Sequence, residues 1–372
     1  MNNLTFSAPC HFGTEGIVAN ELRFMDIENV KAETGRVLFS GDFCTLARAN
    51  LRLRCAERVH ILVAQFYATS FEELFENTAK LPWEEFIGKA EAFPVKGSCL
   101  DSKLMSISDC QKIVKKAVAK RLGDKYSTAW LEETEAVHQV QFLIRQNNVS
   151  LMIDTSGAPL HKRGYRKDAN DAPISETLAA AMADLSRVRQ NHFVTDPMCG
   201  SGTILIESAL KAMNIAAGIN RTFSAENWSC IDNKVFKAER ELAKSLERPD
   251  CDFFAVGSDI DPKALEVARI NALIAGVGDR IEFIERDLRD FLPQRERGTL
   301  ITNPPYGERL LSIKEAEELY RTMGKVFVRK SGWSYAAITP DDDFEKCFGR
   351  PADKRRKLYN GMLQCQLYMY YL

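Results

Sequence analysis

The sequence has no long apolar run and no excess of either charge. No stretch approaches the 18 or more apolar residues that a membrane-spanning helix needs. A formal net charge of −1 over 372 residues also excludes a uniformly basic protein. The start, MNNLTFSAPC, lacks a basic region followed by an apolar segment, so no secretory signal is predicted. These absences together predict a cytoplasmic protein.

The sequence also lacks paired cysteines. Its ten cysteines are scattered with no C-x-x-C pair, and the five histidines do not cluster with them. Neither a metal site nor a disulfide framework is therefore predicted. What is present is ordinary for a globular protein, with 45% apolar and 27% charged residues. A chain of this length exceeds one typical core and predicts two or three domains.

The first half reads as short strands and helices of an α+β region. Strands are predicted over residues 58–68 and 90–95, and a helix over residues 70–80. Ser108 or Asp109 can cap a further helix that runs to Leu122. Residues 217–249 form a helical insertion whose role the sequence does not indicate.

After Asn191 the pattern changes to alternating strands and helices. This alternation predicts a parallel, doubly wound sheet of the α/β class. The Asn360-Gly361 pair between two strand-like runs predicts a C-terminal hairpin, which adds an antiparallel edge to that sheet.

Two segments are rich in basic residues. Residues 96–125 hold eight basic residues against three acidic ones, and Lys112, Lys115, Lys116 and Lys120 share one helix face. Residues 161–167 place four basic residues around Tyr165 on a loop that precedes a helix whose first turn holds Glu176. Such segments suit contacts to nucleic-acid phosphates and stacking on an unpaired base. The alternatives are a solvated helix face and a solvated linker.

Glycines and acids follow the predicted strands of the second half. The first strand ends in Asp196-Pro197-Met198-Cys199-Gly200-Ser201-Gly202-Thr203, where the glycines allow a ligand to approach the backbone. No Gly-Lys-Ser/Thr follows, and Ile204 and Leu205 stand where a dinucleotide site has its third glycine. Asp259 and Asp287 end the next two strands, where they can accept from a ribose and an adenine amine. A tight turn and helix caps are the alternatives for each residue taken alone.

The fourth strand of this half ends at Asn303. Pro304 and Pro305 have no backbone N–H and cannot extend the sheet, so the strand stops in a stiff polar tip. There Asn303 offers an acceptor and a donor, and Tyr306 offers a flat ring. The tip suits a planar group that carries an NH2. A simple strand-to-loop transition is the alternative.

These motifs resemble those of Rossmann-fold S-adenosylmethionine-dependent methyltransferases that act on exocyclic amines. DPMCGSGT is similar to their cofactor-binding motif and NPPY to their catalytic tetrapeptide. KGSCLDSKLMSISDCQKIVKKAV, LMIDTSGAPLHKRGYR and APISETLAAAM are similar to a ferredoxin-like unit and a THUMP RNA-binding domain joined to a guanine-N2 methyltransferase, as in the bacterial 23S rRNA group. NPPY alone also occurs in DNA adenine-N6 and protein glutamine-N5 methyltransferases.

The resemblance implies domain limits and site residues. It implies a ferredoxin-like unit over residues 1–65, a THUMP domain over 66–157, a linker over 158–172 and a methyltransferase domain over 173–372. The implied cofactor contacts for S-adenosylmethionine are Glu176, Asp196, Pro197, Cys199, Gly200, Gly202, Thr203, Asp259, Ile260, Asp287, Leu288 and Asn303. The catalytic tip is Asn303, Pro304, Pro305 and Tyr306, and the RNA contacts are Lys96, Lys103, Lys112, Lys116, Lys162, Arg163, Tyr165 and Arg166.

The predicted reaction is methyl transfer to the N2 amine of a guanine in 23S rRNA. Asn303 Oδ1 and the Pro304 carbonyl accept the two amine hydrogens, and Tyr306 stacks on a base that is unpaired or flipped. The alternatives are a guanine in tRNA, a protein glutamine, and a non-catalytic RNA-binding or ribosome-assembly factor that retains the cofactor fold. RNA is the predicted partner in each of these interpretations except that of a protein glutamine.

Overall fold

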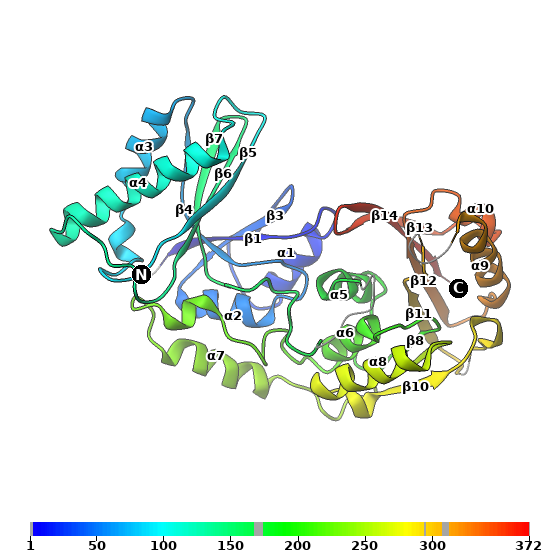
Figure 1. The fold of residues 1–372 in the computed structure, drawn as a ribbon. Helices are drawn as coiled ribbons and strands as arrows, with labels where there is room; N and C mark the ends of the chain where they lie inside the picture. The colour runs from blue at the N-terminus through cyan, green and yellow to red at the C-terminus, as the bar shows by residue number, and fades with distance from the viewer. Residues whose placement is uncertain (1–2, 167–173, 294, 307–311, 372) are drawn as a thin grey trace.

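Two seven-stranded sheets, one in each of two lobes, organise the computed structural model (Figure 1). The structure describes residues 3–166, 174–293, 295–306 and 312–371. Residues 167–172 of the predicted linker lie outside these ranges, as do residues 307–309, which follow the predicted catalytic tip. None of the described helices is long and apolar enough to cross a membrane.

The sheet of the first lobe runs continuously through the predicted ferredoxin-like and THUMP regions. Its strand order is β2-β3-β1-β4-β7-β6-β5, and β4 pairs with both β1 and β7. The predicted domain limit at residues 65–66 therefore falls within β4. The strands are β1 (Leu4–Pro9), β2 (Lys31–Glu33), β3 (Arg36–Gly41), β4 (His60–Tyr67), β5 (Val95–Leu100), β6 (Gln139–Arg145) and β7 (Asn148–Asp154).

The helices of this lobe bury apolar residues against the sheet. They are α1 (Glu15–Arg23), α2 (Phe43–Arg52), α3 (Phe71–Ala79) and α4 (Ile107–Tyr126). Two predictions were wrong here. The strand expected at residues 90–95 begins only at Val95, because Ala92 makes a single bridge. The cap of α4 is Ser106, whose side chain accepts from the Asp109 N–H, so the helix starts earlier and continues past Leu122.

The second lobe confirms the predicted doubly wound sheet. Strands β10, β9, β8, β11 and β12 lie parallel in that order, and β14 and β13 follow as the antiparallel hairpin at one edge. The chain starts in the middle, at β8, and adds strands first on one side and then on the other. The strands are β8 (Phe193–Asp196), β9 (Phe254–Asp259), β10 (Ile281–Glu285), β11 (Gly298–Thr302), β12 (Trp333–Thr339), β13 (Lys354–Asn360) and β14 (Leu363–Tyr371).

Helices cover both faces of this sheet. Ile301 and Ala336 pack with one set of helices, and their neighbours Leu300 and Ala337 pack with the other set. The first face carries α5 (Glu176–Leu185), α6 (Thr203–Ala212) and α8 (Pro262–Ile274). The second carries α9 (Ile313–Val326) and α10 (Phe344–Phe348). The alternation of buried side chains is the physical basis of the two-sided packing.

The insertion at residues 217–249 leaves the second lobe and packs against the first. Its helix α7 (Lys234–Ser245) packs on α2 of the first lobe, where Arg48 pairs with the buried Glu239 at 2.9 Å. Trp228 stacks on His138 of the first lobe with ring centroids 4.2 Å apart. The segment without a readable role in the sequence is therefore an interface element.

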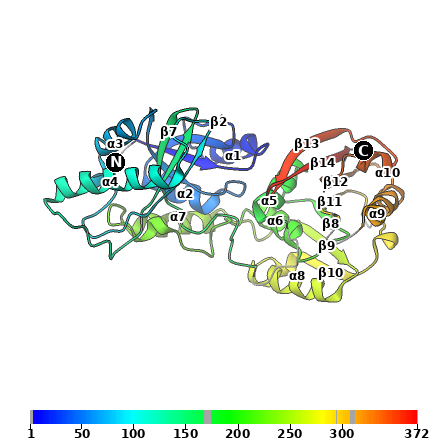
Figure 2. The same ribbon diagram turned by 45° about the horizontal axis from the view of Figure 1, so that its top comes forward.

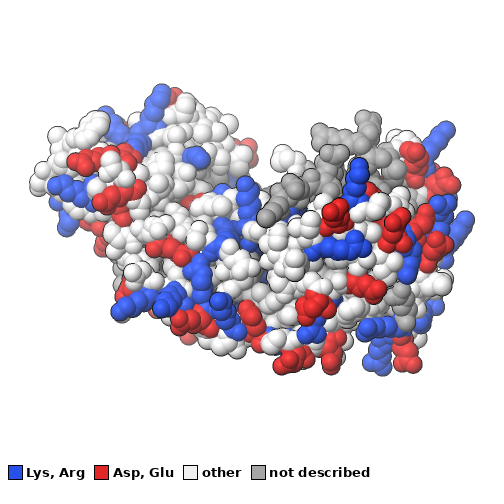
Figure 3. Space-filling model, turned by 60° about the horizontal axis from the view of Figure 1, so that its bottom comes forward, with Lys and Arg blue, Asp and Glu red and all other residues white. Residues whose placement is uncertain are grey.

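Basic side chains gather where the lobes join. Figure 3 shows Lys and Arg side chains over the middle of one face, below the notch between the lobes. A cavity of about 1170 Å³ lies between α1 and α2 on one side and the ends of α5, α6 and α7 on the other. Its basic lining residues include Arg52, Arg187, Arg189 and Arg248.

Candidate active site

The strand ends that carried the predicted motifs meet at one cavity of about 680 Å³. β8 and β11 are neighbours at the point where the winding reverses, and ligands bind beyond the carboxyl ends of strands at such a point. The predicted residues that line the cavity are Asp196, Pro197, Cys199, Gly200, Thr203, Asp259, Ile260, Asp287, Leu288, Asn303, Pro304, Pro305 and Tyr306. Two predicted cofactor residues, Glu176 and Gly202, are not among them.

The glycine turn after β8 depends on backbone that only glycine adopts freely. Gly200 and Gly202 have φ of +50° and +78°. A Cβ at Gly202 would lie 3.1 Å from both Ala268 and Phe283, so this glycine serves close packing beneath the loop. The Gly200 N–H donates to Asp259 Oδ2 at 2.9 Å, which joins the ends of β8 and β9.

Asp196 joins the ends of β8 and β11. It is buried and accepts from the Thr302 hydroxyl at 2.7 Å and from the Met198 N–H at 3.1 Å. Burial raises the pKa of Asp196 to about 7; those two hydrogen bonds oppose the rise and the nearby Asp259 adds to it. A cationic group bound beside Asp196 would favour its charged form.

The other two acids, Asp259 and Asp287, accept hydrogen bonds from different kinds of donor. Asp259 accepts from the backbone N–H groups of Gly200 and Asp261. Asp287 accepts from the Arg289 side chain at 2.9 and 2.6 Å, and these hydrogen bonds lower the pKa of Asp287 to about 2. An adenine amine at Asp287 would therefore share this carboxylate with Arg289 or displace it.

Within the described part of the chain, the predicted catalytic tip holds a polar atom without a hydrogen-bond partner. Asn303 Oδ1 is buried and accepts no hydrogen bond from any described residue. An unpaired buried acceptor costs about 1–3 kcal/mol, so it is the kind of atom that a ligand donor satisfies. The Tyr306 hydroxyl accepts from Asn360 Nδ2 at 2.8 Å, and burial raises the pKa of Tyr306 to about 12. The ring is therefore neutral and anchored from the C-terminal hairpin.

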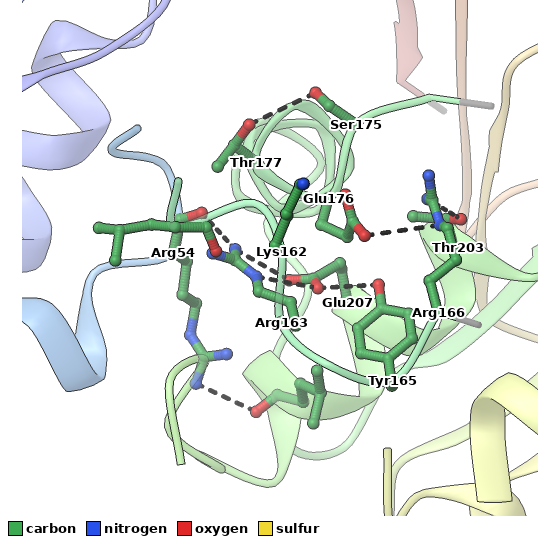
Figure 4. A network of polar contacts seen from close by, with 12 residues as sticks. Arg54, Lys162, Arg163, Tyr165, Arg166, Ser175, Glu176, Thr177, Thr203 and Glu207 are labelled. Carbon is green, nitrogen blue, oxygen red and sulfur yellow. Dashed lines mark hydrogen bonds and ion pairs between the residues drawn. The ribbon is translucent and has the colours of Figure 1, made fainter. Parts of the chain in front are cut away.

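Arg163 and Tyr165 do not lie where the sequence placed them. Both are only 3% exposed, so the prediction that they contact RNA was wrong. The Arg163 guanidinium lies 3.3 Å from Glu207 on α6 and donates to the carbonyls of Leu160 and Arg54 (Figure 4). The Tyr165 hydroxyl donates to the same Glu207 at 3.0 Å. A buried carboxylate needs such partners, which is the physical reason for their position.

Arg166 lies behind the glycine turn that follows β8. Its Nη2 donates to Thr203 Oγ1 at 2.7 Å and to the Ile174 carbonyl at 2.9 Å, and its Nε lies 3.5 Å from Glu176. Burial raises the pKa of Glu176, and Arg166 opposes that rise. Glu176 thus supports the cavity wall through Arg166. Of this segment's predicted RNA contacts, Lys162 is exposed.

The predicted RNA contacts of the first lobe are exposed. Lys96 lies on β5, Lys103 follows it, and Lys112 and Lys116 lie on α4. The predicted stripe on α4 is narrower than expected, because Lys115 turns to Glu133 at 2.6 Å and covers the Phe93 ring.

Sequence reasoning missed three features of the site. Thr302 precedes the tip and donates to Asp196, and Asn360 reaches Tyr306 from a distant part of the chain. The third is a run of exposed basic residues on β13, namely Lys354, Arg355, Arg356 and Lys357. Four consecutive basic residues before an Asn-Gly turn were a readable signal, whereas the two hydrogen bonds were not. Among the described residues, no His, Cys, Asp and Glu side chains group in a way that could hold a metal ion.

The chain matches three family models in sequence order. Residues 5–60 match an RlmL ferredoxin-like domain, and residues 68–154 match a THUMP domain. Residues 163–369, more than half of the chain, match the RMKL-like methyltransferase domain.

Relatives match over almost the whole chain. The YpsC protein of Bacillus subtilis (strain 168), whose name describes an RNA methyltransferase, is 41% identical over 100% of this chain and 97% of its own length. The ribosomal RNA large subunit methyltransferase K/L of Psychromonas ingrahamii is 32% identical over 99% of this chain, which spans about half of that relative's length. The solved methyltransferase SMU.472, in complex with SAH, is 39% identical over 100% of this chain and 98% of its own, with a TM-score of 0.94.

These matches confirm the predicted family and its S-adenosylmethionine-dependent chemistry. The cavity at β8 and β11 lies within the matched methyltransferase domain, and the exposed lysines of α4 and β5 lie within the matched THUMP domain. The chain belongs to the RMKL-like methyltransferases that carry a ferredoxin-like unit and a THUMP domain before the catalytic domain.

Proposed function

We propose that this protein transfers a methyl group from S-adenosylmethionine to the N2 amine of a guanine in 23S rRNA. The observation that carries the proposal is Asn303 Oδ1, a buried acceptor without a described partner, in the wall of the cavity. The large-subunit rRNA methyltransferase among the relatives supports the choice of RNA.

The residues of the cavity fit the cofactor. A volume of about 680 Å³ lies in the range of ordinary small-ligand sites. The glycine turn opens the backbone for a close approach, Asp259 would accept from a ribose, and the exposed Ile260 and buried Leu288 would offer apolar surface to a base. When bound, S-adenosylmethionine supplies a methyl group on a positively charged sulfur. The buried Asp196 offers this site the negative charge that such a group favours.

The catalytic tip acts by orientation. The guanine amine is a poor nucleophile because its lone pair is delocalised into the ring. Asn303 Oδ1 and the Pro304 carbonyl would accept its two hydrogens and direct the lone pair toward the methyl group. Tyr306 lines the same cavity and is held by Asn360, so its ring can stack on the base. No general base is needed before transfer, because the amine loses its proton afterwards.

The first lobe supplies the RNA contacts in this proposal. Lys96, Lys103, Lys112 and Lys116 are exposed on the THUMP region, and Lys162 lies between the lobes. Basic side chains of this kind position an RNA backbone without reading its sequence. The domain limits at 1–65, 66–157, 158–172 and 173–372 remain part of the proposal, although the first lobe's sheet is continuous across one of them.

Two other functions stay distinguishable. A guanine in tRNA offers the same amine, so equal turnover on tRNA and rRNA from cells lacking the enzyme would remove the preference for rRNA. A non-catalytic RNA-binding factor need not bind the cofactor, which calorimetry with S-adenosylmethionine measures directly.

The test of the tip is Asn303→Ala. Loss of one acceptor should lower turnover on rRNA by about 10²–10³, because its stabilisation acts in the transition state. Asn191→Ala, at an exposed asparagine before β8, is the matched control and should keep full turnover. Turnover of Asn303→Ala within threefold of wild type would contradict the role of Asn303. A methyl group found on adenine N6 in the digested RNA would contradict the guanine assignment.

A further inference from the structure

The β13–β14 hairpin extends beyond the edge of the sheet that holds the catalytic tip. Thr339, the last residue of β12, pairs with Gln366 of β14. Residues 363–365 and the turn before them therefore continue past that edge, by about 10 Å for three residues of strand. Because β12 and β11 are parallel, this is the edge at which the candidate active site lies.

The hairpin is fixed between the active site and the first lobe. Asn360 donates to the Tyr306 hydroxyl at 2.8 Å. On its other side, Phe12 and Tyr359 meet edge to face with centroids 5.8 Å apart. A Cβ added at Gly13 would lie 2.5 Å from the Lys357 carbonyl, so the two backbones are closely packed. Figure 2 shows the hairpin reaching from the second lobe toward α1.

The tip of the hairpin exposes apolar side chains. Met362 is 99% exposed and Leu363 is 45% exposed. Because they are adjacent on a turn beside the candidate active site, these two side chains offer a small apolar surface that a bound ligand can bury. A flexible, unbranched Met is one of the side chains that proteins insert between base steps.

Behind this tip, β13 presents positive charge. Lys354, Arg356 and Lys357 are exposed, and no carboxylate of the described residues pairs with them. Arg355 is different, because it pairs with Glu345 and lies over the Tyr368 ring. Charges on an edge strand also discourage pairing with other sheets. That role accounts for the basic residues alone. It does not account for the exposed Met362, which lies two residues after the Asn360 that holds Tyr306.

We propose that this hairpin separates a base pair of the RNA substrate at the target guanine. Met362 enters the stack where the guanine leaves it, and the cations of β13 hold the neighbouring phosphates. Taking a base out of a helix costs a few kcal/mol, and an apolar wedge that replaces it in the stack recovers part of that cost. The partner is thus base-paired RNA rather than a strand that is already open. The inference rests on the proposed function, since it assumes an RNA target.

The experiment compares one RNA in two forms. The rRNA helix that contains the mapped target guanine is used either paired or with its complementary strand left out. Met362→Ala should lower turnover on the paired form about tenfold and leave the unpaired form within twofold of wild type. Leu273→Ala, at another exposed apolar residue in the same lobe, should change neither. Equal losses on both forms, or no loss on the paired form, would overturn the proposal.

A second measurement separates this proposal from the proposed function. The paired RNA carries 2-aminopurine opposite or beside the target, and its fluorescence reports unstacking without methylation. A rise with wild type that is lost in Met362→Ala supports the hairpin even if no guanine is methylated, which would overturn only the proposed function. No rise with wild-type protein under saturating conditions would overturn the hairpin's role. Because Met362 is exposed, the thermal unfolding of the variant should match wild type.

Discussion

Two basic segments with an aromatic neighbour have different surroundings in this molecule. Residues 161–166 hold Lys162, Arg163 and Arg166 around Tyr165, and residues 354–357 hold four basic residues before Tyr359. Arg163 and Tyr165 of the first segment are buried between the lobes, whereas the second segment is exposed on an edge strand. In sequence the two look alike.

The difference lies in the acidic residues that face each segment. Glu207 and Glu176 pair with Arg163 and Arg166 in the first segment. In the second segment Glu345 pairs with Arg355, and the remaining three cations have no described carboxylate partner. In these two segments, the intramolecular acids show which cations are already held within the protein. Glu207, on α6, lies 44 positions from Arg163, whereas Glu176, at the start of α5, is close to Arg166 in sequence.

The largest effect that would test this comparison is on stability. Arg163→Ala leaves Glu207 buried without its charge partner, so we expect a loss of about 3–5 kcal/mol of unfolding free energy. Chemical denaturation measures it, with Lys162→Ala as the exposed neighbour that should stay within about 0.5 kcal/mol. Replacing both partners, as Arg163→Met with Glu207→Met, should cost less than Arg163→Ala. A stable Arg163→Ala protein with weakened RNA binding would reverse our interpretation of this segment.

A smaller effect should distinguish two neighbours on β13. Arg356→Ala should weaken binding to paired rRNA about three- to tenfold and reduce the slope of log K against log salt by about 0.7–0.9, as for one lost phosphate contact. Arg355→Ala is the matched control, because Glu345 already holds that side chain. Filter binding at several salt concentrations measures both. Equal losses would mean that the carboxylate partner does not decide which basic residue meets RNA.

The smallest effect concerns pH. Burial alone would raise the pKa of Glu57, but hydrogen bonds from His11, His161 and Thr177 lower it below its ordinary value of 4.5. A depressed carboxyl pKa contributes stability above pH 4.5, which is lost as pH falls through the folded-state pKa.

Glu57→Gln should therefore flatten the decline of stability between about pH 5 and pH 2, with a modest loss at neutral pH. Unfolding midpoints across that range measure it. Glu345→Gln, on α10, serves as the comparison because this carboxylate lies outside the joint between the lobes. If the stability of Glu57→Gln declined at low pH as steeply as that of wild type, protonation of Glu57 would not control the stability of this joint.

Much of the second lobe was predictable because its signals are local. The strand ends at Asp196, Asp259 and Asn303 and the Asn-Gly turn at residue 360 each follow from a few neighbouring residues. The family resemblance supplied what spacing alone did not, namely the identity of the cofactor and the choice of guanine in the proposed function. Most of the predicted cofactor and catalytic residues line the cavity, whereas Glu176 and Gly202 do not.

The rest depended on contacts between distant residues. Burial of Arg163 follows from Glu207, which lies 44 positions away and carries no sign of its partner. The Tyr306 to Asn360 hydrogen bond spans 54 positions. The insertion at residues 217–249 could be placed only once α7 was seen against α2. Propensity and periodicity describe elements, whereas these features describe how elements meet.

The joint around Arg163 and Glu57 has a consequence for protein engineering. Arg163 donates to the Arg54 carbonyl of one lobe and to Glu207 of the other, and Glu57 accepts from Thr177 across the same boundary. A chimaera that joins this catalytic lobe to another RNA-binding lobe must therefore also transfer the turn at residues 54–57 and the segment at residues 161–166. An exchange of the RNA-binding lobe is therefore expected to succeed only when these joint residues are exchanged with it.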